Sequence, residues 1–301
     1  MYRVEIVGLE LPMISQGDDL AKLIVEAAQR AGVGIEDGDV VAISSKVVSK
    51  AVGSIVKLDS VSPSDEAKRI ASIVGEDPRF IELVLRESDR ILAVIPMREL
   101  VERGIVRLEN MARNVEAARR IIERFPVLFL VLREGSLWTD AGLDSSNLPD
   151  DYIAIPPRNL DEIAKKIRDR VRELTGKRVA VVVCDTEGFI GGSIDIARGS
   201  YGIEPRDRCF GEPDLYGKPK YGGVDIVVHE ICAATALIAK QTSRGVPAAI
   251  VRGLQYEECE CGLRDRMSID ISRGREAIRL IVAWTRKVLG LGSLIRSLLG
   301  L

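Results

Sequence analysis

The chain has 301 residues, of which 46% are hydrophobic and 29% are charged, a composition typical of a globular protein with a substantial core. Its 43 basic and 45 acidic residues give a formal net charge of −2, which removes the broad cationic surface that nucleic-acid binding usually needs. No apolar run reaches the roughly 18 residues of a membrane span, and the N-terminus reads as a strand rather than a signal peptide. We therefore expect a cytoplasmic protein without nucleic-acid or membrane partners.

The first part of the chain alternates strand and helix patterns. Residues 2–7 predict a strand, and apolar spacing from Leu20 predicts a helix that ends near Gly32. A second buried strand over 39–43 leads into the segment 44–50, which carries two lysines and three hydroxyls. Ammonium and hydroxyl groups can share phosphate oxygens, so the segment suits anion binding. A solvated edge with incidental lysines explains the same pattern equally well.

Two helices with clear start signals follow. Ser64 and Asp77 stand at capping positions, and the helices are expected to end at Gly75 and near Glu87. The charged segment 100–124 predicts a surface helix, longer than a simple connection requires. An apolar run over 126–132 predicts another buried strand.

The central signal is a run of five apolar residues, 179–183, followed by Asp185, Thr186, Glu187 and Gly188. Such a run predicts a strand buried on both faces of a sheet. Ligands of open α/β sheets bind beyond the carboxyl ends of strands, so Asp185 is a candidate ligand for a metal or a phosphate-bearing substrate. Taken alone, Asp185 is more readily explained as the cap of a turn than as a ligand. A second acidic cluster around Asp144 follows the strand over 126–132.

The remaining elements are read in the same way. An amphipathic helix is predicted over 160–174, and the glycine-rich stretch after Asp185 is predicted to be a long loop. Strands are predicted over 224–228 and 247–251, with a small-residue helix over 230–240 between them. An amphipathic helix over 278–288 and an apolar tail are expected to pack on the core or on a partner subunit.

The cysteines and the histidine exclude several kinds of site. Five cysteines without CxxC spacing make a disulfide framework or a zinc ribbon unexpected, and Cys184 is predicted to be a core residue. Cys259 and Cys261 alone do not complete a tetrahedral metal site. His229 has no supporting motif and is expected to be structural. A metal would therefore be held by oxygen atoms, which selects Mg²⁺ or Mn²⁺.

Six short motifs in order resemble the γ-glutamyl ligases of deazaflavin cofactor biosynthesis. They are Leu11-Pro12-Met13-Ile14 with Gly17-Asp18-Asp19-Leu20, Ser45-Lys46-Val47-Val48-Ser49-Lys50, Ala141-Gly142-Leu143-Asp144-Ser145-Ser146-Asn147, Asp185-Thr186-Glu187-Gly188, Asp214-Leu215-Tyr216-Gly217 and Val251-Arg252-Gly253-Leu254. The resemblance implies a mixed α/β (α+β) fold of two interleaved subdomains with mixed sheets, an intertwined homodimer, a ligase domain over 1–254 and a C-terminal helical extension over 255–301 packed on that domain.

The resemblance also implies a reaction. Enzymes of this family add L-glutamate to the coenzyme F420 precursor F420-0 and extend it with further γ-linked glutamate, using GTP, two divalent ions (Mg²⁺ or Mn²⁺) and, as a further candidate, K⁺. Catalytic roles fall to Asp144, Asp185 and Lys50, and metal binding falls to Asp144, Asp185, Thr186 and Gln241. The residues implied in GTP binding are Leu11, Pro12, Met13, Ile14, Ser45, Lys46, Lys50, Asn147, Ala239, Lys240, Gln241, Thr242, Ser243, Arg244, Gly245 and Val246.

Departures from the family pattern keep two alternatives open. Phe189 to Ser193 replace the usual basic or aromatic residues, and Asp140 stands where the family has Asn. His229 replaces an Asp, and Ala239 and Lys240 replace a Met-Gly pair. A ligase of the same fold acting on a different carboxylate is one alternative. A nucleotide-binding protein without catalysis is the other.

Overall fold

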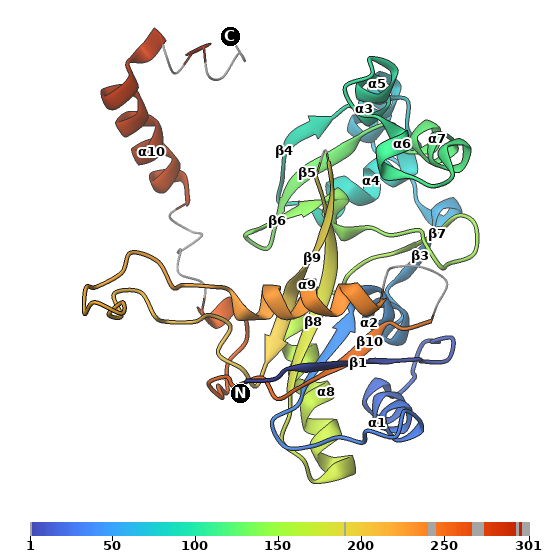
Figure 1. Cartoon of the computed structure of the whole chain (residues 1–301). Helices are drawn as coiled ribbons and strands as arrows, with labels where there is room; N and C mark the ends of the chain where they lie inside the picture. Colours follow the sequence, from blue (N-terminus) through green and yellow to red (C-terminus); the bar gives the residue numbers. More distant parts are fainter. Residues whose placement is uncertain (1, 190, 240–244, 267–273, 293–294, 297–301) are drawn as a thin grey trace. The chain divides into compact units, whose positions relative to one another are not determined.

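The computed structural model describes residues 2–189, 191–239, 245–266, 274–292 and 295–296 (Figure 1). The chain divides into two units, Met1–Arg266 and Met267–Leu301. The second unit contains α10 (Gly274–Leu289), which confirms the helix predicted over 278–288. The packing of a C-terminal extension on the ligase domain stays a prediction. No helix within the described ranges is both long and apolar enough to cross a membrane.

Within the described residues, five strands form one mixed sheet in the order β1-β10-β2-β8-β9. The pair β2 and β8 is parallel, and the other neighbours are antiparallel. The strand bounds are Glu5–Leu9 for β1, Ala248–Arg252 for β10, Val40–Ser44 for β2, Ala180–Phe189 for β8 and Gly192–Tyr201 for β9. The mixed α/β fold class is thereby confirmed.

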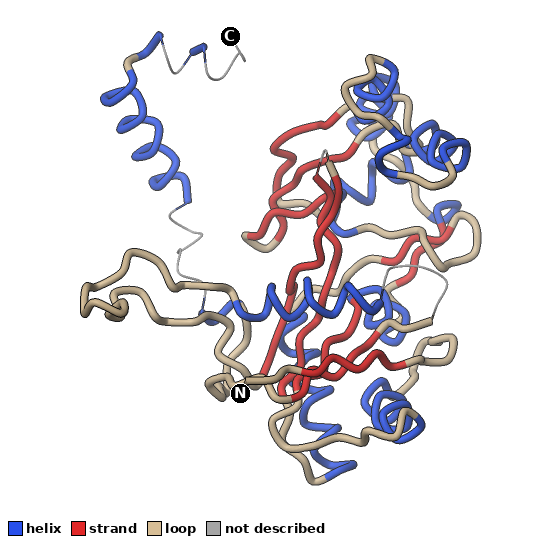
Figure 2. The backbone as a smooth tube through the Cα atoms, viewed as in Figure 1, coloured by secondary structure: helices blue, strands red, loops and turns tan. Residues whose placement is uncertain are grey.

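Helices cover both faces of this sheet, as Figures 1 and 2 show. Alternate residues of β8 point to opposite sides: Val181 and Val183 belong to one buried cluster, Ala180 and Val182 to the other. The bounds of the helices on the first side are Leu20–Arg30 for α1, Ser45–Val52 for α2 and Leu160–Thr175 for α8, and α9 (Val227–Ala239) covers the second side. The prediction of a strand buried on both faces is confirmed.

The chain between α2 and α8 forms two smaller sheets in the described part of the molecule, with strand orders β3-β7 and β4-β5-β6. The strand bounds are Ile55–Lys57 for β3, Arg90–Ile95 for β4, Leu128–Arg133 for β5, Ser136–Thr139 for β6 and Tyr152–Ala154 for β7. These two sheets and the helices α3 to α7, which lie within residues 65–124, make up the second subdomain of the first unit. The hairpin of β8 and β9 reaches it, and the amide of Gly188 donates to Thr139 Oγ1 there at 3.2 Å. One long strand therefore belongs to both parts of the first unit.

The predicted helix starts are confirmed. The Ser64 hydroxyl accepts from the amide of Ala67 at the start of α3 (Asp65–Val74), and Gly75 ends the helix with a left-handed φ of 79°. Asp77 caps α4 (Pro78–Glu87) in the same way. The segment predicted as one helix over 100–124 is instead divided among α5 (Met97–Glu102), α6 (Leu108–Met111) and α7 (Val115–Arg124).

Two predictions after residue 184 are wrong. Residues 185–189 continue β8, and 192–201 form β9, where the sequence predicts a loop. Glycine lowers strand propensity, but a Cβ on Gly199 would lie 2.6 Å from the backbone carbon of Leu160, so α8 requires glycine there. The strand predicted over 224–228 is also wrong, because Val227 begins α9. Packing against the sheet overrides the strand preference of β-branched residues.

The expectation that the cysteines form no disulfide framework is wrong as well, although Cys184 is buried in the core as predicted. A disulfide joins Cys184 on β8 to Cys232 on α9, and a second one joins Cys259 to Cys261. Cys209 is the remaining free cysteine among the residues described. The first pair is 48 positions apart in sequence, so only the packing of α9 on β8 reveals it.

Candidate active site

A cavity of about 600 Å³ lies where β2, α2, β8 and the loop around Asp144 meet. Its walls include Asp144, Asp185, Thr186, Lys46 and Lys50, all five of which the sequence had put forward. They come from three separate stretches of the chain. The cavity therefore gathers side chains that are up to 140 residues apart, from Lys46 to Thr186.

Asp185 lies where β2 ends, since the parallel pairing of β2 with β8 stops at Ser44 opposite Cys184. Its Oδ1 accepts from the Ser45 hydroxyl at 2.9 Å, whereas Oδ2 is buried and has no hydrogen-bond partner among the described residues. Burial raises the pKa of Asp185 to about 6, while Arg198 and Ser45 oppose the rise. A buried oxygen without a donor requires an explanation, and a bound cation is one that fits a carboxylate on a cavity wall.

A bulge in β9 positions the arginine that faces this carboxylate. The register of β8 and β9 shifts between Val183 and Cys184, which leaves Arg198 as the extra residue on β9. Arg198 pairs with Glu187 and lies over the ring of Trp138 at 3.7 Å from its centroid. The Trp138 side chain is buried, so it packs in the protein core.

Asp144 stands on a turn that requires unusual backbone angles. Asp140, Ala141 and Gly142 have φ values of 49°, 55° and 76°, and a Cβ on Gly142 would lie 2.6 Å from the Trp138 ring. Beyond this turn, Asp144 Oδ1 accepts from the amide of Ser146 at 2.7 Å. The turn thus directs one carboxylate into the cavity from the second subdomain.

Lys46 and Lys50 are one helical turn apart on α2, so both reach the same side. Lys46 Nζ lies 2.7 Å from Asp144 Oδ2 and also donates to Ser146. Lys50 Nζ donates to the carbonyl of Asn147 at 2.7 Å. Burial and the neighbouring Lys46 lower the pKa of Lys50, and Asp144 opposes that change. The two lysines tie α2 to the Asp144 loop.

The residues implied in GTP binding lie partly on this cavity. Leu11, Pro12, Met13, Ile14, Asn147, Ala239, Gly245 and Val246 line it, and Ser45 is connected through Asp185. The amide of Leu11 donates to the carbonyl of Gly245 at 3.1 Å, which joins the N-terminal loop to the segment before β10. The predicted residues Lys240, Gln241, Thr242, Ser243 and Arg244 lie outside the described residues.

Two acidic residues of the cavity were missed from the sequence. Asp195 on β9 faces Thr186 in the strand register, and its Oδ1 accepts from the Thr186 hydroxyl at 2.8 Å. A glycine-rich hairpin predicted as a loop concealed this pairing. Asp140 also lines the cavity; it accepts from the amide of Phe129 at 2.7 Å, and burial raises its pKa to about 7.

His229 is structural, as expected. Its Nδ1 accepts from the amide of Ala197 at 3.2 Å, and burial together with Arg198 lowers its pKa to about 4. A neutral imidazole that accepts a backbone hydrogen bond holds α9 against β9. It supplies no proton relay to the cavity.

This arrangement suits chemistry on phosphate groups. Carboxylate and hydroxyl oxygens are ligands that Mg²⁺ and Mn²⁺ prefer, and the buried Asp185 Oδ2 fits such an ion. Two ammonium groups beside the acids can neutralise phosphate oxygens. Phosphoryl transfer requires chiefly such positioning and neutralisation.

Comparison with known proteins gives a consistent result. The family described as F420-0:gamma-glutamyl ligase matches residues 8–253. The chain is 36% identical over 255 residues to the coenzyme F420:L-glutamate ligase of Archaeoglobus fulgidus, covering 84% of this chain and 88% of the relative. It is 34% identical to the ligase of the same name from Methanothermobacter thermautotrophicus (84% and 90% covered) and 35% identical to that from Methanopyrus kandleri (85% and 88%). The chain therefore belongs to the F420-0:γ-glutamyl ligase family.

Proposed function

We propose that this protein is a GTP-dependent ligase that joins L-glutamate to the carboxylate of F420-0 and then adds further γ-linked glutamate. The observation that carries the proposal is the convergence of Asp144, Asp185, Lys46 and Lys50 on one cavity. The names of the relatives supply the substrates, which are glutamate and coenzyme F420.

The reaction proceeds in two steps. A carboxylate oxygen of the acceptor attacks the γ-phosphorus of GTP, which releases GDP and leaves an acyl phosphate. The glutamate amine then attacks the acyl carbon, phosphate leaves, and the nitrogen loses a proton as the amide forms. Activation is needed because a free carboxylate has no adequate leaving group.

The chain's own groups have distinct parts in this scheme. Asp144, Asp185, Thr186 and Gln241 would hold two divalent ions, Mg²⁺ or Mn²⁺, with K⁺ as a further candidate. Bound divalent ions supply positive charge that offsets charge developing on the phosphate oxygens. Lys46 and Lys50 bind further phosphate oxygens, and the apolar loop from Leu11 to Ile14 contacts the nucleoside.

The test is a direct assay. Purified protein is incubated with GTP, Mn²⁺, F420-0 and L-glutamate, and both GDP and the mass of the product are measured. We expect glutamate-dependent GDP release together with a product one glutamyl unit heavier. Absence of glutamate-dependent GDP release would count decisively against the proposal.

A second candidate is the same reaction on a different carboxylate. It is favoured by Asp140, an acid with a raised pKa on the cavity wall where family members carry Asn. A screen of other carboxylic acids in the same assay separates the two candidates. GDP release with another acid, and none with F420-0, supports the second.

The proposal includes a homodimer. The loop between β9 and α9 exposes Phe210, Leu215, Tyr216 and Tyr221, which are apolar side chains suited to an interface between copies. Light scattering after size-exclusion chromatography measures the mass directly. A monomer at all concentrations contradicts this part of the proposal.

A further inference from the structure

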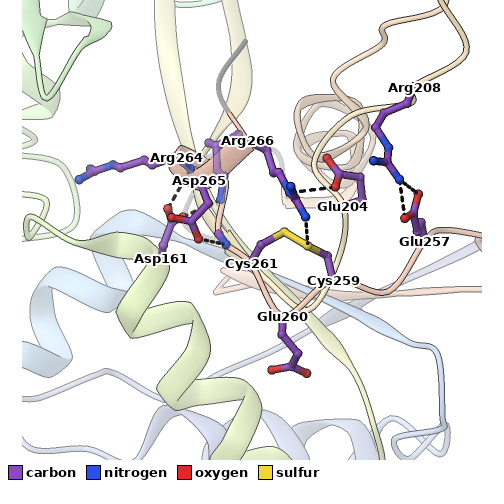
Figure 3. The surroundings of a disulfide bond; sticks show 12 residues. Asp161, Glu204, Arg208, Glu257, Cys259, Glu260, Cys261, Arg264, Asp265 and Arg266 are labelled. Atoms are coloured by element: carbon purple, nitrogen blue, oxygen red, sulfur yellow. Dashed lines mark hydrogen bonds and ion pairs between the residues drawn. A yellow bond between two sulfur atoms is a disulfide. The ribbon is translucent and has the colours of Figure 1, made fainter. Parts of the chain in front are cut away.

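The segment Cys259-Glu260-Cys261 follows β10 and lies outside the part of the chain that the family matches. Its two cysteines form a disulfide, drawn in Figure 3. Cys261 is buried, and Cys259 is partly exposed. The segment has no part in the proposed ligase reaction, so its chemistry requires a separate explanation.

A buried carboxylate lies beside these sulfur atoms. Glu204 is 3% exposed, and its carboxylate oxygen and the two Sγ atoms all lie within 4.8 Å of one another. The backbone amide of Glu204 donates to the carbonyl of Glu257 at 2.8 Å, which fixes the two loops together. A side chain 55 positions before the cysteines thereby supplies the third group that two thiols alone lack.

The Glu204 carboxylate has an ion pair but no hydrogen bond among the described residues. Arg266 Nε lies 3.1 Å from Glu204 Oε2, and Arg266 donates to Cys259 Sγ at 3.5 Å. Oε1 and Oε2 of Glu204 are both buried and have no hydrogen-bond partner among the described residues. A buried carboxylate oxygen left without a donor costs free energy unless a cation or a proton meets it.

The charges change with the state of the disulfide. With the disulfide closed, the negative charge of Glu204 is matched by Arg266. With the disulfide open, two thiolates add two negative charges to the same small volume, which a divalent ion would balance. We propose that Cys259, Cys261 and Glu204 form a reduction-dependent site for a thiophilic divalent ion, with Zn²⁺ as the natural choice.

The chemistry balances with a dithiol reductant. The reductant donates two electrons and two protons, the bond between the two sulfur atoms breaks, and the reductant becomes a disulfide. The ion then displaces the two thiol protons and binds two thiolates and one carboxylate oxygen. Zinc accepts sulfur at about 2.3 Å and oxygen at about 2.0–2.2 Å in tetrahedral geometry, and water takes the fourth position.

Neighbouring contacts prepare the site. Arg266 orients the Glu204 carboxylate in the way that outer hydrogen bonds orient metal ligands. Glu260, the residue between the cysteines, points away from them in Figure 3. Its carboxylate accepts from Arg168. Asp161 accepts from the amides of Leu263 and Arg264 and holds the chain just after Cys261.

Cobalt is the probe, because thiolate-bound Co²⁺ gives intense charge-transfer absorption that oxygen-bound Co²⁺ does not. The full-length protein is treated anaerobically with a phosphine reductant, its free thiols are counted by alkylation and mass spectrometry, and Co²⁺ is titrated. We expect one equivalent of thiolate-bound Co²⁺ after reduction, displaceable by Zn²⁺, and none before. Fully reduced protein without this absorption overturns the proposal, as does a Cys259–Cys261 disulfide that resists reduction in the folded protein.

Variants identify the ligands. Cys259→Ser and Cys261→Ser should each abolish the absorption, while Cys209→Ser should retain it. Glu204→Gln should weaken Co²⁺ binding by more than the roughly 10–100-fold that outer partners of a metal ligand contribute. Glu257→Gln is the matched control, because Glu257 is an exposed acid on the loop that carries the cysteines and pairs with Arg208. Unchanged affinity in Glu204→Gln, or absorption that depends on Cys184 and Cys232 instead, refutes the site.

Discussion

Asp185 combines two properties that normally conflict. Its carboxylate faces a cavity in which a charge is useful, yet burial raises its pKa to about 6, so the ionised form is costly in the protein alone. The Ser45 hydroxyl and Arg198 compensate in part. The residue is consistent with a site whose electrostatics are completed only when a cation binds.

The substitution Asp185→Asn tests this balance. We expect GDP release to fall at least roughly a hundredfold, because a ligand to a charge-neutralising ion contributes several kcal/mol. Stability at pH 7 should be equal or higher, because the folded protein favours the protonated form, which Asn resembles. Thermal unfolding and the GTP assay measure the two effects.

The sign of the pH effect follows from the raised pKa. From about pH 4 to pH 6 the wild-type protein loses stability through Asp185, since the unfolded carboxyl ionises more readily. This contribution should be missing in Asp185→Asn. Asp37→Asn, at an exposed position, serves as a control for activity. Wild-type activity in Asp185→Asn removes this residue from the site.

At the scale of single elements, close contacts between helices and strands decide what is tolerated. Gly199 on β9 packs against α8. A Cβ atom at this position would lie only 2.6 Å from the backbone carbonyl carbon of Leu160. Neither backbone can move away cheaply, because both elements belong to the buried core.

Gly199→Ala should therefore destabilise the protein by about 1–3 kcal/mol. The measurement is the free energy of unfolding in denaturant. Gly191→Ala is the matched control, since no atom lies within 4 Å of a Cβ at that position and its φ is not in the left-handed region. Equal losses in both variants would show that α8 does not impose the glycine.

The disulfide between β8 and α9 is a second constraint between elements. It closes a loop of 48 residues in the unfolded chain, for which loop entropy predicts about 4 kcal/mol of stabilisation. Cys232→Ser should lower the melting temperature under oxidising conditions. The variant should also lose the drop in melting temperature that reduction of the Cys184–Cys232 bond causes in the wild type. Cys209→Ser, which removes the free cysteine, should leave the melting temperature close to that of the wild type.

The sequence predicted local elements better than pairings. Capping residues such as Ser64 and Asp77 act within one helical turn, so their effect could be read directly. Asp195 and Glu204 could not be found, because each acquires its role from a partner that only the folded chain brings near. The same applies to Cys184 and Cys232. The place of Asp185 on the cavity could be anticipated because β2 ends opposite Cys184, although β8 itself continues past Asp185.

At the scale of the whole first unit, burial raises the pKa of several carboxyl groups, so that they favour the protonated form. Burial, aided by Asp140 and Asp77, raises the pKa of Glu76 to about 8, and Asp140 itself titrates near 7. Both oxygens of Glu76 are buried without hydrogen-bond partners in the described part of the chain. Ionisation of these groups makes the fold progressively less stable as pH rises from about 3.8, the ordinary pKa of Asp140, to about 8, the raised pKa of Glu76.

Glu76→Gln should remove the part of this pH-dependent loss of stability that comes from ionisation of Glu76. Its gain in melting temperature over the wild type should be near zero below pH 4.5, where Glu76 is protonated in both states, and should increase up to pH 8. Thermal unfolding across this range is the measurement. A gain that does not vary with pH would mean that packing, not ionisation, sets the effect.

The strand β8 runs without interruption from the five-stranded sheet into the second subdomain, and Asp185 lies midway along it. Rotating one subdomain against the other would mean bending this two-stranded rod and breaking its ladder of backbone hydrogen bonds. The enzyme is thus better suited to binding its substrates in a preformed cavity than to closing two subdomains around them. Crystals of the protein should therefore tolerate soaking with substrates without cracking.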